Sequence, residues 1–376
     1  MKLTVDTVAL IRRLRAVENR SLGEASFGRQ KRTSSHPRGA SSSERFSTAR
    51  LLGVRLLGVR LLGVRLLGLS LVLCAASLPT NAQVSIDRAA VYQKALLSYV
   101  DDARPSLAVM TVETRAISGA RLLRFSYMSA NGQRVPALLF MPIRASVAHP
   151  VSCLVLLHGL GGSKETMAGL ALFAAKSGYA SLAIDEYGQG ERTPAKPSAL
   201  PPAEEVAMTV HQSALDVRRG LDYLATRPDI SKSHVGLAGI SLGAIIGTVA
   251  AGVDPRIKAT ALISGGGDWG LILKTLSANH TEVGGRSTAN LKGIDWDQIS
   301  VLLAPEDPLT FAPHIAPRAL LMVGGRKDTT IVVPAQQELY EAARDPKAIQ
   351  WFAQYGHVPP PEVVYPALQK FFAARL

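Results

Sequence analysis

The stretch that most constrains the fold is residues 234–251, HVGLAGISLGAIIGTVAA. An apolar run of strand character, residues 234–238, leads into GISLG at 239–243, and a helix-like run follows. A G-x-S-x-G motif between a strand and a helix is a nucleophile elbow, a turn so sharp that it exposes the serine oxygen. A Cβ two residues before or after the serine would collide with neighbouring backbone, which explains the two glycines. The context predicts that Ser241 is a nucleophile, where a bare motif would fit a tightly packed strand–helix junction equally well.

A serine hydroxyl barely ionises near neutral pH, so Ser241 needs a general base and an acid that orients the base. After such an elbow the partners follow in the order acid, then histidine, each in a loop just past a strand. Asp328 follows the predicted strand 319–323, and His357 follows the predicted strand 348–353. Taken singly, Asp328 also fits a turn or capping aspartate and His357 a loop histidine. Together, their order and placement predict a catalytic triad of Ser241, Asp328 and His357.

An acyl-transfer intermediate carries an oxyanion that two N–H donors must hold. One predicted donor is the backbone N–H of Leu242, directly after the nucleophile. The other is expected from the loop 158–162, HGLGG, which follows the first buried strand, and Leu160 is its best candidate. His158, at the start of this loop, is expected to brace the loop rather than to move protons.

The order of the predicted strands and helices indicates the fold class. Two strands, 121–128 and 133–141, are joined at Asn131-Gly132, a hairpin turn signal. The alternation that follows has strands at 151–157, 180–184, 234–238, 259–263, 319–323 and 348–353, and helices at 164–177, 203–226, 334–343 and 361–374. This pattern predicts an α/β fold with a mostly parallel sheet, an N-terminal antiparallel hairpin and helices on both faces. Residues 268–306 exceed a normal connection and are expected to form a small cap.

The N-terminal part of the chain differs in composition from the rest. Residues 1–64 are expected to be a disordered or untranslated leader, and they contain three tandem copies of LLGVR, a period that specifies no amphipathic face. Residues 65–82 combine a positive residue, a short apolar run and small residues ending at Ala82, which predicts a secretory signal peptide. The protein is therefore expected to be secreted or periplasmic. Residues 83–120 are predicted to be a helical lead-in, and residues 121–376 the catalytic domain.

The charge balance argues against nucleic-acid binding. The net charge is +13, but residues 1–82 hold 14 Lys and Arg against 4 Asp and Glu, and residues 83–376 hold 28 against 25. The basicity thus belongs to the leader, and the body has no basic patch with interleaved aromatic residues. The two cysteines, Cys74 and Cys153, predict neither a disulfide framework nor a metal site.

These motifs resemble the α/β-hydrolase superfamily, over residues 121–376. The resemblance is carried by NGQRVPALLFMP (131–142), LLHGLGGSKE (156–165), DEYGQGER (185–192), GISLG (239–243), DPLTFAPHIAPRALLMVGGRKD (307–328) and GH (356–357). Within the superfamily the chain resembles the branch of dienelactone-hydrolase-like proteins, acetyl-xylan and cephalosporin esterases and prolyl-oligopeptidase-type catalytic domains. Dienelactone hydrolases proper use a cysteine nucleophile, so Ser241 favours ester hydrolysis. Prolyl peptidases carry a propeller ahead of the catalytic domain, and residues 83–120 are too short a segment to contain one.

The resemblance implies a serine carboxylesterase that hydrolyses small or acetyl-type esters through an acyl-enzyme, without a metal or organic cofactor. An exo-acting serine peptidase or amidase is the alternative, and a non-catalytic binding protein on a hydrolase scaffold is a remote one. The expected partner is a small-molecule ester, with no nucleic acid and no stable membrane insertion after signal cleavage; the oligomeric state stays open. Asp185, Glu186 and Trp269 are candidates for the mouth of the site, although Asp185 and Glu186 also fit an ion-pair cluster that braces a loop.

Overall fold

The structure is a computed structural model that describes residues 85–100, 105–117, 119–196, 202–279, 282–283, 286–287 and 293–376. The predicted leader over 1–64 and the predicted signal peptide over 65–82 lie outside the described residues. Among the residues that are described, no helix has the length and apolar character needed to cross a membrane.

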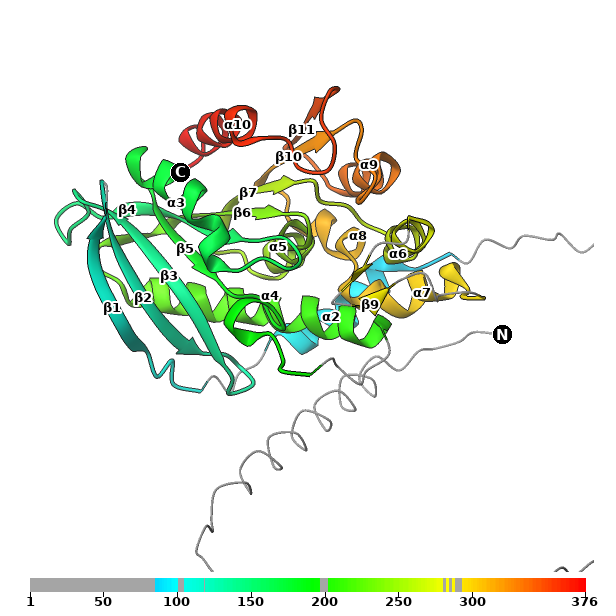
Figure 1. Ribbon diagram of the computed structural model, residues 1–376, viewed down its shortest axis with the longest axis horizontal. Helices are drawn as coiled ribbons and strands as arrows, with labels where there is room; N and C mark the ends of the chain where they lie inside the picture. The colour runs from blue at the N-terminus through cyan, green and yellow to red at the C-terminus, as the bar shows by residue number, and fades with distance from the viewer. Residues whose placement is uncertain are drawn as a thin grey trace, which may run out of the picture. The chain divides into compact units, whose positions relative to one another are not determined.

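One nine-stranded sheet forms the centre of the fold, in the order β1-β2-β3-β5-β4-β6-β7-β10-β11 (Figure 1). Its strands are β1 (Met110–Ile117), β2 (Ala120–Met128), β3 (Arg134–Pro142), β4 (Val151–Leu157), β5 (Ala180–Ile184), β6 (Ile230–Ile240), β7 (Ile257–Ile263), β10 (Ala319–Gly325) and β11 (Lys347–Phe352). The first three strands pair antiparallel, β3 pairs antiparallel with β5, and all later neighbours are parallel. The predicted hairpin and the predicted mostly parallel sheet are both confirmed.

Helices cover both faces of this sheet (Figure 1), as the alternating pattern predicts. They are α2 (Arg88–Tyr99), α3 (Ala168–Lys176), α4 (Pro202–Thr226), α5 (Leu242–Val253), α6 (Trp269–Ala278), α7 (Trp296–Leu303), α8 (Pro308–Phe311), α9 (Val333–Ala342) and α10 (Pro361–Ala373). On one face, α3 and α10 bury Leu170 and Leu368 against the strands. On the other, α4 and α5 bury Val210 and Ile246 in a second cluster. Because both faces are covered, β4, β5 and β10 are almost entirely buried and lack an alternation of exposed polar residues.

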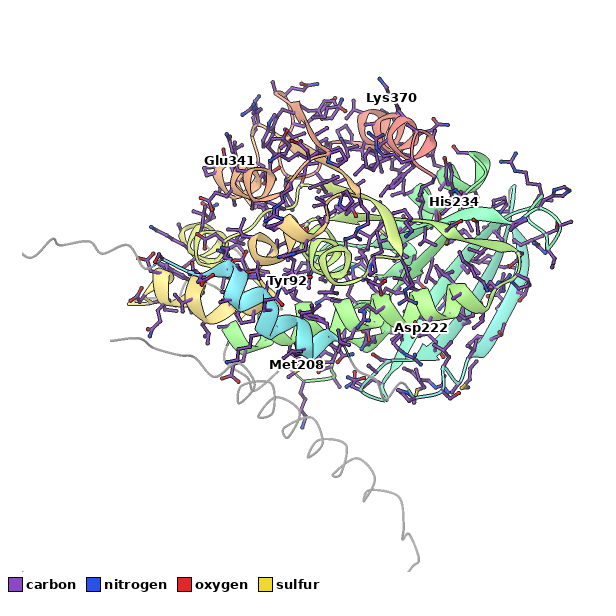
Figure 2. The ribbon with its side chains drawn as sticks, turned by 180° about the vertical axis from the view of Figure 1, so that it is seen from behind. Tyr92, Met208, Asp222, His234, Glu341 and Lys370 are labelled. Carbon is purple, nitrogen blue, oxygen red and sulfur yellow. The ribbon has the colours of Figure 1, made fainter. Side chains whose placement is uncertain are left out.

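Helix α2 packs outside α5 in this second layer. The hydroxyl of Tyr92, labelled in Figure 2, donates a hydrogen bond to the carbonyl of Gly252 at 3.1 Å. The neighbouring Tyr99 is completely buried and meets the ring of Phe311 edge to face. The segment before the hairpin is therefore part of the folded unit.

Strand β1 was not predicted from the sequence, which treated residues 83–120 as a helical lead-in. It extends the sheet at its edge and pairs only with β2, with an irregular register between Thr111 and Glu113. Its residues are exposed except for the half-buried Ile117. A strand with no buried face carries no alternation of apolar and polar residues, so its sequence lacked the usual signal.

The insertion between β7 and β10 contains α6, the short strands β8 (Glu282–Val283) and β9 (Arg286–Ser287), and α7. Asp268 caps α6 by accepting hydrogen bonds from the N–H groups of Gly270 and Leu271. The carboxylate of Asp307 accepts from the backbone N–H of Trp269 at 3.0 Å, so the end of the insertion is fastened to its beginning.

Glu306, at the end of the insertion, is buried with only 2% of its surface exposed. Its Oε1 lies 3.8 Å from Nδ1 of His211. Burial raises the pKa of the Glu306 carboxyl from 4.5 to about 8, because the charged form loses its hydration. The native state therefore holds a proton on Glu306 at pH values where the unfolded chain has released it.

We expect this proton to make the free energy of unfolding fall as pH rises between 4.5 and about 8. Over that window unfolding releases the Glu306 proton, which higher pH favours, and one group contributes at most about 1.4 kcal/mol per pH unit. Urea denaturation of wild type and Glu306→Gln at several pH values checks this. The variant should gain stability relative to wild type as pH rises. A constant difference, or one that favours wild type at high pH, would show that burial does not raise the pKa of Glu306.

Candidate active site

Ser241 occupies the sharp turn between β6 and α5, with φ 55° and ψ −116°. Non-glycine residues rarely adopt this conformation, and it stores strain at the turn. A Cβ at Gly239 would lie 2.2 Å from the carbonyl oxygen of Gly243, and a Cβ at Gly243 would lie 2.5 Å from that of His158. Both glycines are thus required sterically, as the motif predicts. The N–H of Ser241 donates to the carbonyl of Ile263 at 2.8 Å, which holds the turn against β7.

The structure brings the side chains of Ser241, His357 and Asp328 together. Nε2 of His357 lies 2.9 Å from Oγ of Ser241, and Nδ1 of His357 lies 3.0 and 2.9 Å from the two carboxylate oxygens of Asp328. Asp328 follows β10 and His357 follows β11, and β6, β7, β10 and β11 are parallel neighbours in the sheet. The carboxyl ends of these strands lie at one edge, and this is why residues far apart in sequence meet there.

Asp328 is held in place by further donors. Its Oδ1 accepts hydrogen bonds from the backbone N–H groups of Thr330 and Ile331 at 2.9 and 3.0 Å, and Gln336 Nε2 donates to Oδ2 at 3.0 Å. The side chain is completely buried, so these bonds replace the water that the carboxylate has lost. Gln336 lies on α9, and nothing in the sequence marked it. The hydroxyl of Ser264 also donates to the carbonyl of His357, which fixes the histidine loop.

Leu242 and the 158–162 loop, from which the two oxyanion donors are expected, are both close to Ser241. Leu242 begins α5, whose N-terminus directs N–H groups toward the turn. The 158–162 loop is close by, since a Cβ built at Gly159 would lie 3.5 Å from Cβ of Ser241. Among the hydrogen bonds of the described residues, none uses the N–H of Leu242 or Leu160. Both groups are therefore unengaged within the described chain.

His158, the first residue of this loop, is completely buried. Its Nδ1 is 2.8 Å from the carbonyl of Gly159, and its Nε2 accepts from the N–H of Glu186 at 3.4 Å. Burial lowers the pKa of the imidazole, although the Gly159 carbonyl opposes this shift. A neutral ring that donates from Nδ1 and accepts at Nε2 satisfies both contacts, so His158 links the loop to the segment after β5.

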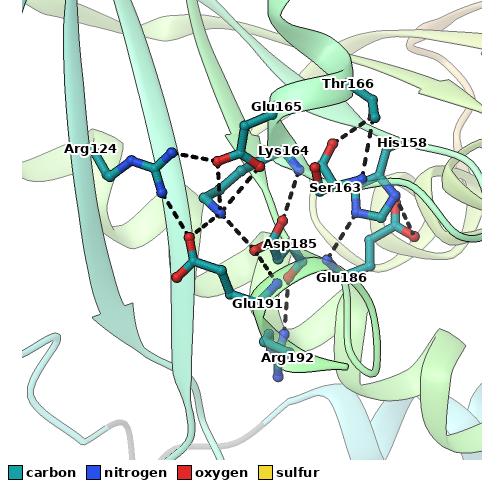
Figure 3. Close-up of polar contacts among 10 residues, drawn as sticks. All are labelled: Arg124, His158, Ser163, Lys164, Glu165, Thr166, Asp185, Glu186, Glu191 and Arg192. Carbon is teal, nitrogen blue, oxygen red and sulfur yellow. Dashed lines mark hydrogen bonds and ion pairs between the residues drawn. The ribbon is translucent and has the colours of Figure 1, made fainter. Parts of the chain in front are cut away.

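Asp185 and Glu186 are both completely buried, and Trp269 is 4% exposed. Asp185 accepts from the N–H and the ammonium of Lys164, each at 2.8 Å (Figure 3). Burial raises the pKa of Glu186 well above its usual value, and neither of its carboxyl oxygens has a hydrogen-bond partner among the described residues. The indole N–H of Trp269 donates to the carbonyl of Glu306 at 3.3 Å. These three residues are buried, and Asp185 belongs to the ion-pair cluster that the sequence offers as the alternative; their placement at the mouth of the site stays a prediction.

Lys164 is the centre of the ion-pair cluster that the sequence left as an alternative. Its side chain is 1% exposed, and its ammonium contacts Asp185, Glu191 at 2.7 Å and Glu165 at 3.1 Å. Burial alone would lower the pKa of Lys164, but the hydrogen bonds to Asp185 and Glu191 outweigh it and raise the pKa. Arg124 of β2 joins the cluster through Glu165 and Glu191 (Figure 3).

Within the described ranges, no group of three or more His, Cys, Asp or Glu side chains is placed to hold a metal ion. Cys153 is fully buried in β4, and burial raises the pKa of its thiol to about 12. Its thiol is therefore not a competing nucleophile near neutral pH.

The sheet order, the flanking helices and the elbow after β6 give the chain an α/β-hydrolase fold. Residues 87–264 match the family model of acetyl xylan esterases (AXE1), so this part of the chain is similar to that family.

Individual proteins are also similar to this chain in sequence or in structure. The protein YtaP of Bacillus subtilis (strain 168) is 24% identical over 240 residues, which are 59% of this chain and 76% of YtaP. The solved structure of an acetyl xylan esterase from Paenibacillus sp. R4 is 21% identical with a TM-score of 0.62, covering 78% of this chain and 95% of that one. Acetyl xylan esterase 1 from Thermoanaerobacterium sp. JW/SL YS485 is 17% identical with a TM-score of 0.59, covering 77% and 93%. At these identities the structures establish the shared fold.

Proposed function

We propose that the protein is a serine carboxylesterase in which Ser241 is the nucleophile, His357 the general base and Asp328 the residue that orients the base. The observation that carries the proposal is the continuous hydrogen-bonded chain Ser241–His357–Asp328, with contacts of 2.9 to 3.0 Å. In this arrangement the serine contacts its base and the base contacts its orienting carboxylate, as acyl transfer requires.

The reaction proceeds through a covalent acyl-enzyme. His357 removes the proton from Ser241, and the serine oxygen attacks the ester carbonyl. The N–H groups of Leu242 and Leu160 hold the oxyanion that forms. The ester bond then breaks and the alcohol leaves with the proton from His357. Water, activated by the same histidine, attacks the acyl-enzyme and releases the carboxylic acid and free Ser241.

The proposed substrates are esters of short acyl groups, acetyl above all. The support for this choice is the match to a family described as acetyl xylan esterases, over residues that include the elbow and the oxyanion loop. Secretion or a periplasmic location is a companion proposal, supported by the signal-peptide pattern at 65–82.

The substrate class is tested with a matched panel on the purified protein. We expect kcat/KM for p-nitrophenyl acetate to exceed that for the octanoate by about tenfold or more, because added methylenes must find room in a small acyl pocket. Acetylated xylo-oligosaccharides should also release acetate. Alanine p-nitroanilide is the control for the peptidase alternative and should turn over far more slowly. Faster anilide than ester turnover would replace the esterase by a peptidase or amidase, and a preference for octanoate would rule out the acetyl assignment.

A further inference from the structure

Two loops meet beside Ser241, and hydrogen bonds join them. The first, the oxyanion loop, is residues 158–164 after β4; the second, the clamp loop, is residues 185–192 after β5. Besides the ammonium of Lys164, three backbone N–H groups donate across the two loops: Glu186 to His158 Nε2, Lys164 to Asp185, and Gly161 to Oε1 of Gln189 at 2.8 Å. The first two lie at the base of the oxyanion loop, and the third holds its tip.

The tip of the oxyanion loop is held in place by a hydrogen-bond acceptor and not by a buried side chain. Gly161 has φ +74°, so the backbone turns there, and the side chain of Leu160 is 44% exposed and does not anchor the loop by burial. Within the oxyanion loop, the N–H of Gly162 donates to the carbonyl of Gly159 at 3.0 Å, which closes a tight turn around Leu160. The Gln189 contact fixes the Leu160–Gly161 peptide, and the Gly162 contact fixes the carbonyl of Gly159, which shares a peptide plane with the Leu160 N–H. Together the two contacts hold the turn that carries the Leu160 N–H.

Gln189 is itself held firmly by its own loop. Its N–H donates to the carbonyl of Glu186 at 3.0 Å, and its carbonyl accepts from the N–H of Arg192 at 2.9 Å. Asp185 anchors the start of the clamp loop through Lys164, and it also accepts from the N–H of Glu191 at 3.0 Å (Figure 3). The guanidinium of Arg192 reaches Asp216 on α4. The amide oxygen of Gln189 is therefore presented by a loop tied to both the sheet and a helix.

We infer that Gln189 is a positioning residue, which holds the Leu160 N–H in place to receive the oxyanion by accepting the N–H of Gly161. The inference rests on the proposed serine esterase function. Donors that are fixed in advance stabilise the transition state without reorganisation, and this matters more for the oxyanion than for the neutral ester. Loss of the contact should therefore lower kcat and leave KM nearly unchanged.

The test compares Gln189→Leu, which removes the acceptor, with Gln189→Asn, which withdraws the amide by one methylene. Both variants should lose about 10- to 100-fold in kcat, the range expected when a reacting group is displaced by about 1 Å. The inhibition constant of a trifluoromethyl ketone, whose adduct carries an oxyanion, should rise by the same factor. Titration of the active fraction with a fluorophosphonate corrects for any misfolded protein, so a merely structural loss does not mimic the effect.

Gln369→Leu is the matched control, because Gln369 also makes a side-chain hydrogen bond, to Ser177 at 3.1 Å, but lies on α10. It should keep wild-type kcat and inhibitor affinity. Unchanged kcat in both Gln189 variants, or a loss confined to KM, would overturn the role of Gln189. Failure of the underlying esterase proposal has a different signature, since wild-type turnover would then survive the Ser241→Ala substitution.

Discussion

The Ser241→Ala substitution is expected to abolish ester turnover, lowering kcat by about 10⁴-fold or more. Alanine removes the oxygen that forms the acyl-enzyme and leaves the elbow backbone free to keep its shape, since the turn depends on Gly239 and Gly243 rather than on the serine hydroxyl. The proposed oxyanion donors, the N–H groups of Leu242 and Leu160, remain in the variant, so a small residual rate above the uncatalysed reaction should persist. Stability should change little, because alanine keeps the Cβ and the backbone conformation of residue 241 and loses only the contact between the hydroxyl and His357.

Two measurements check this expectation. Steady-state hydrolysis of p-nitrophenyl acetate gives the loss in kcat, and intact-mass analysis after fluorophosphonate treatment shows one adduct on wild type and none on the variant. Ser177→Ala, which removes another hydrogen-bonded hydroxyl far along the chain, is the matched control and should retain full activity. His357→Ala should be as damaging as Ser241→Ala, and the double variant no worse, because the residues act as one unit. Wild-type turnover in Ser241→Ala would refute the nucleophile assignment.

The central part of the fold was predictable from the sequence because parallel strands buried on both faces leave continuous apolar runs. Strand β4 is VSCLVLL and β5 is ASLAI, and both were located correctly within a residue or two. The meeting of Ser241, Asp328 and His357 was also foreseeable, since each follows a strand whose carboxyl end lies at the same sheet edge. Strand β1 escaped prediction because it has no buried face.

Residues that act through cross-loop contacts were not predictable in the same way. Gln189 and Gln336 lie on segments with no periodic signal that links them to the loops they support, and a glutamine carries no charge to suggest a partner. A lysine is usually exposed, and nothing in the sequence around Lys164 indicates otherwise. In the fold its side chain is buried among three carboxylates. Asp185, Glu186 and Trp269 were noticed for their chemistry, but their burial depends on packing between elements far apart in sequence. Sequence spacing identifies strand ends well and identifies side-chain partners between loops poorly.

The Asp328→Asn substitution is expected to lower kcat by about 10³- to 10⁴-fold while leaving KM within a few-fold of wild type. An asparagine has the same shape but only one acceptor oxygen. In the native site both carboxylate oxygens face Nδ1 of His357, Oδ1 also accepts from Thr330 and Ile331, and Oδ2 from Gln336. If the amide oxygen takes the Oδ1 position, the amide NH₂ takes the Oδ2 position. Two hydrogen-bond donors, this NH₂ and Nε2 of Gln336, then face each other.

The same NH₂ then favours the histidine tautomer with the proton on Nε2. That nitrogen faces Oγ of Ser241 at 2.9 Å, and a protonated Nε2 cannot accept the serine proton. The donor–donor conflict with Gln336 should also lower the free energy of unfolding by about 1–3 kcal/mol, the usual cost of an unsatisfied buried polar group. Kinetics and urea denaturation measure the two effects separately. Asp87→Asn, at the exposed cap of α2, makes the same chemical change and should leave kcat unaltered. An Asp328→Asn variant with kcat within tenfold of wild type would mean that some other group orients His357.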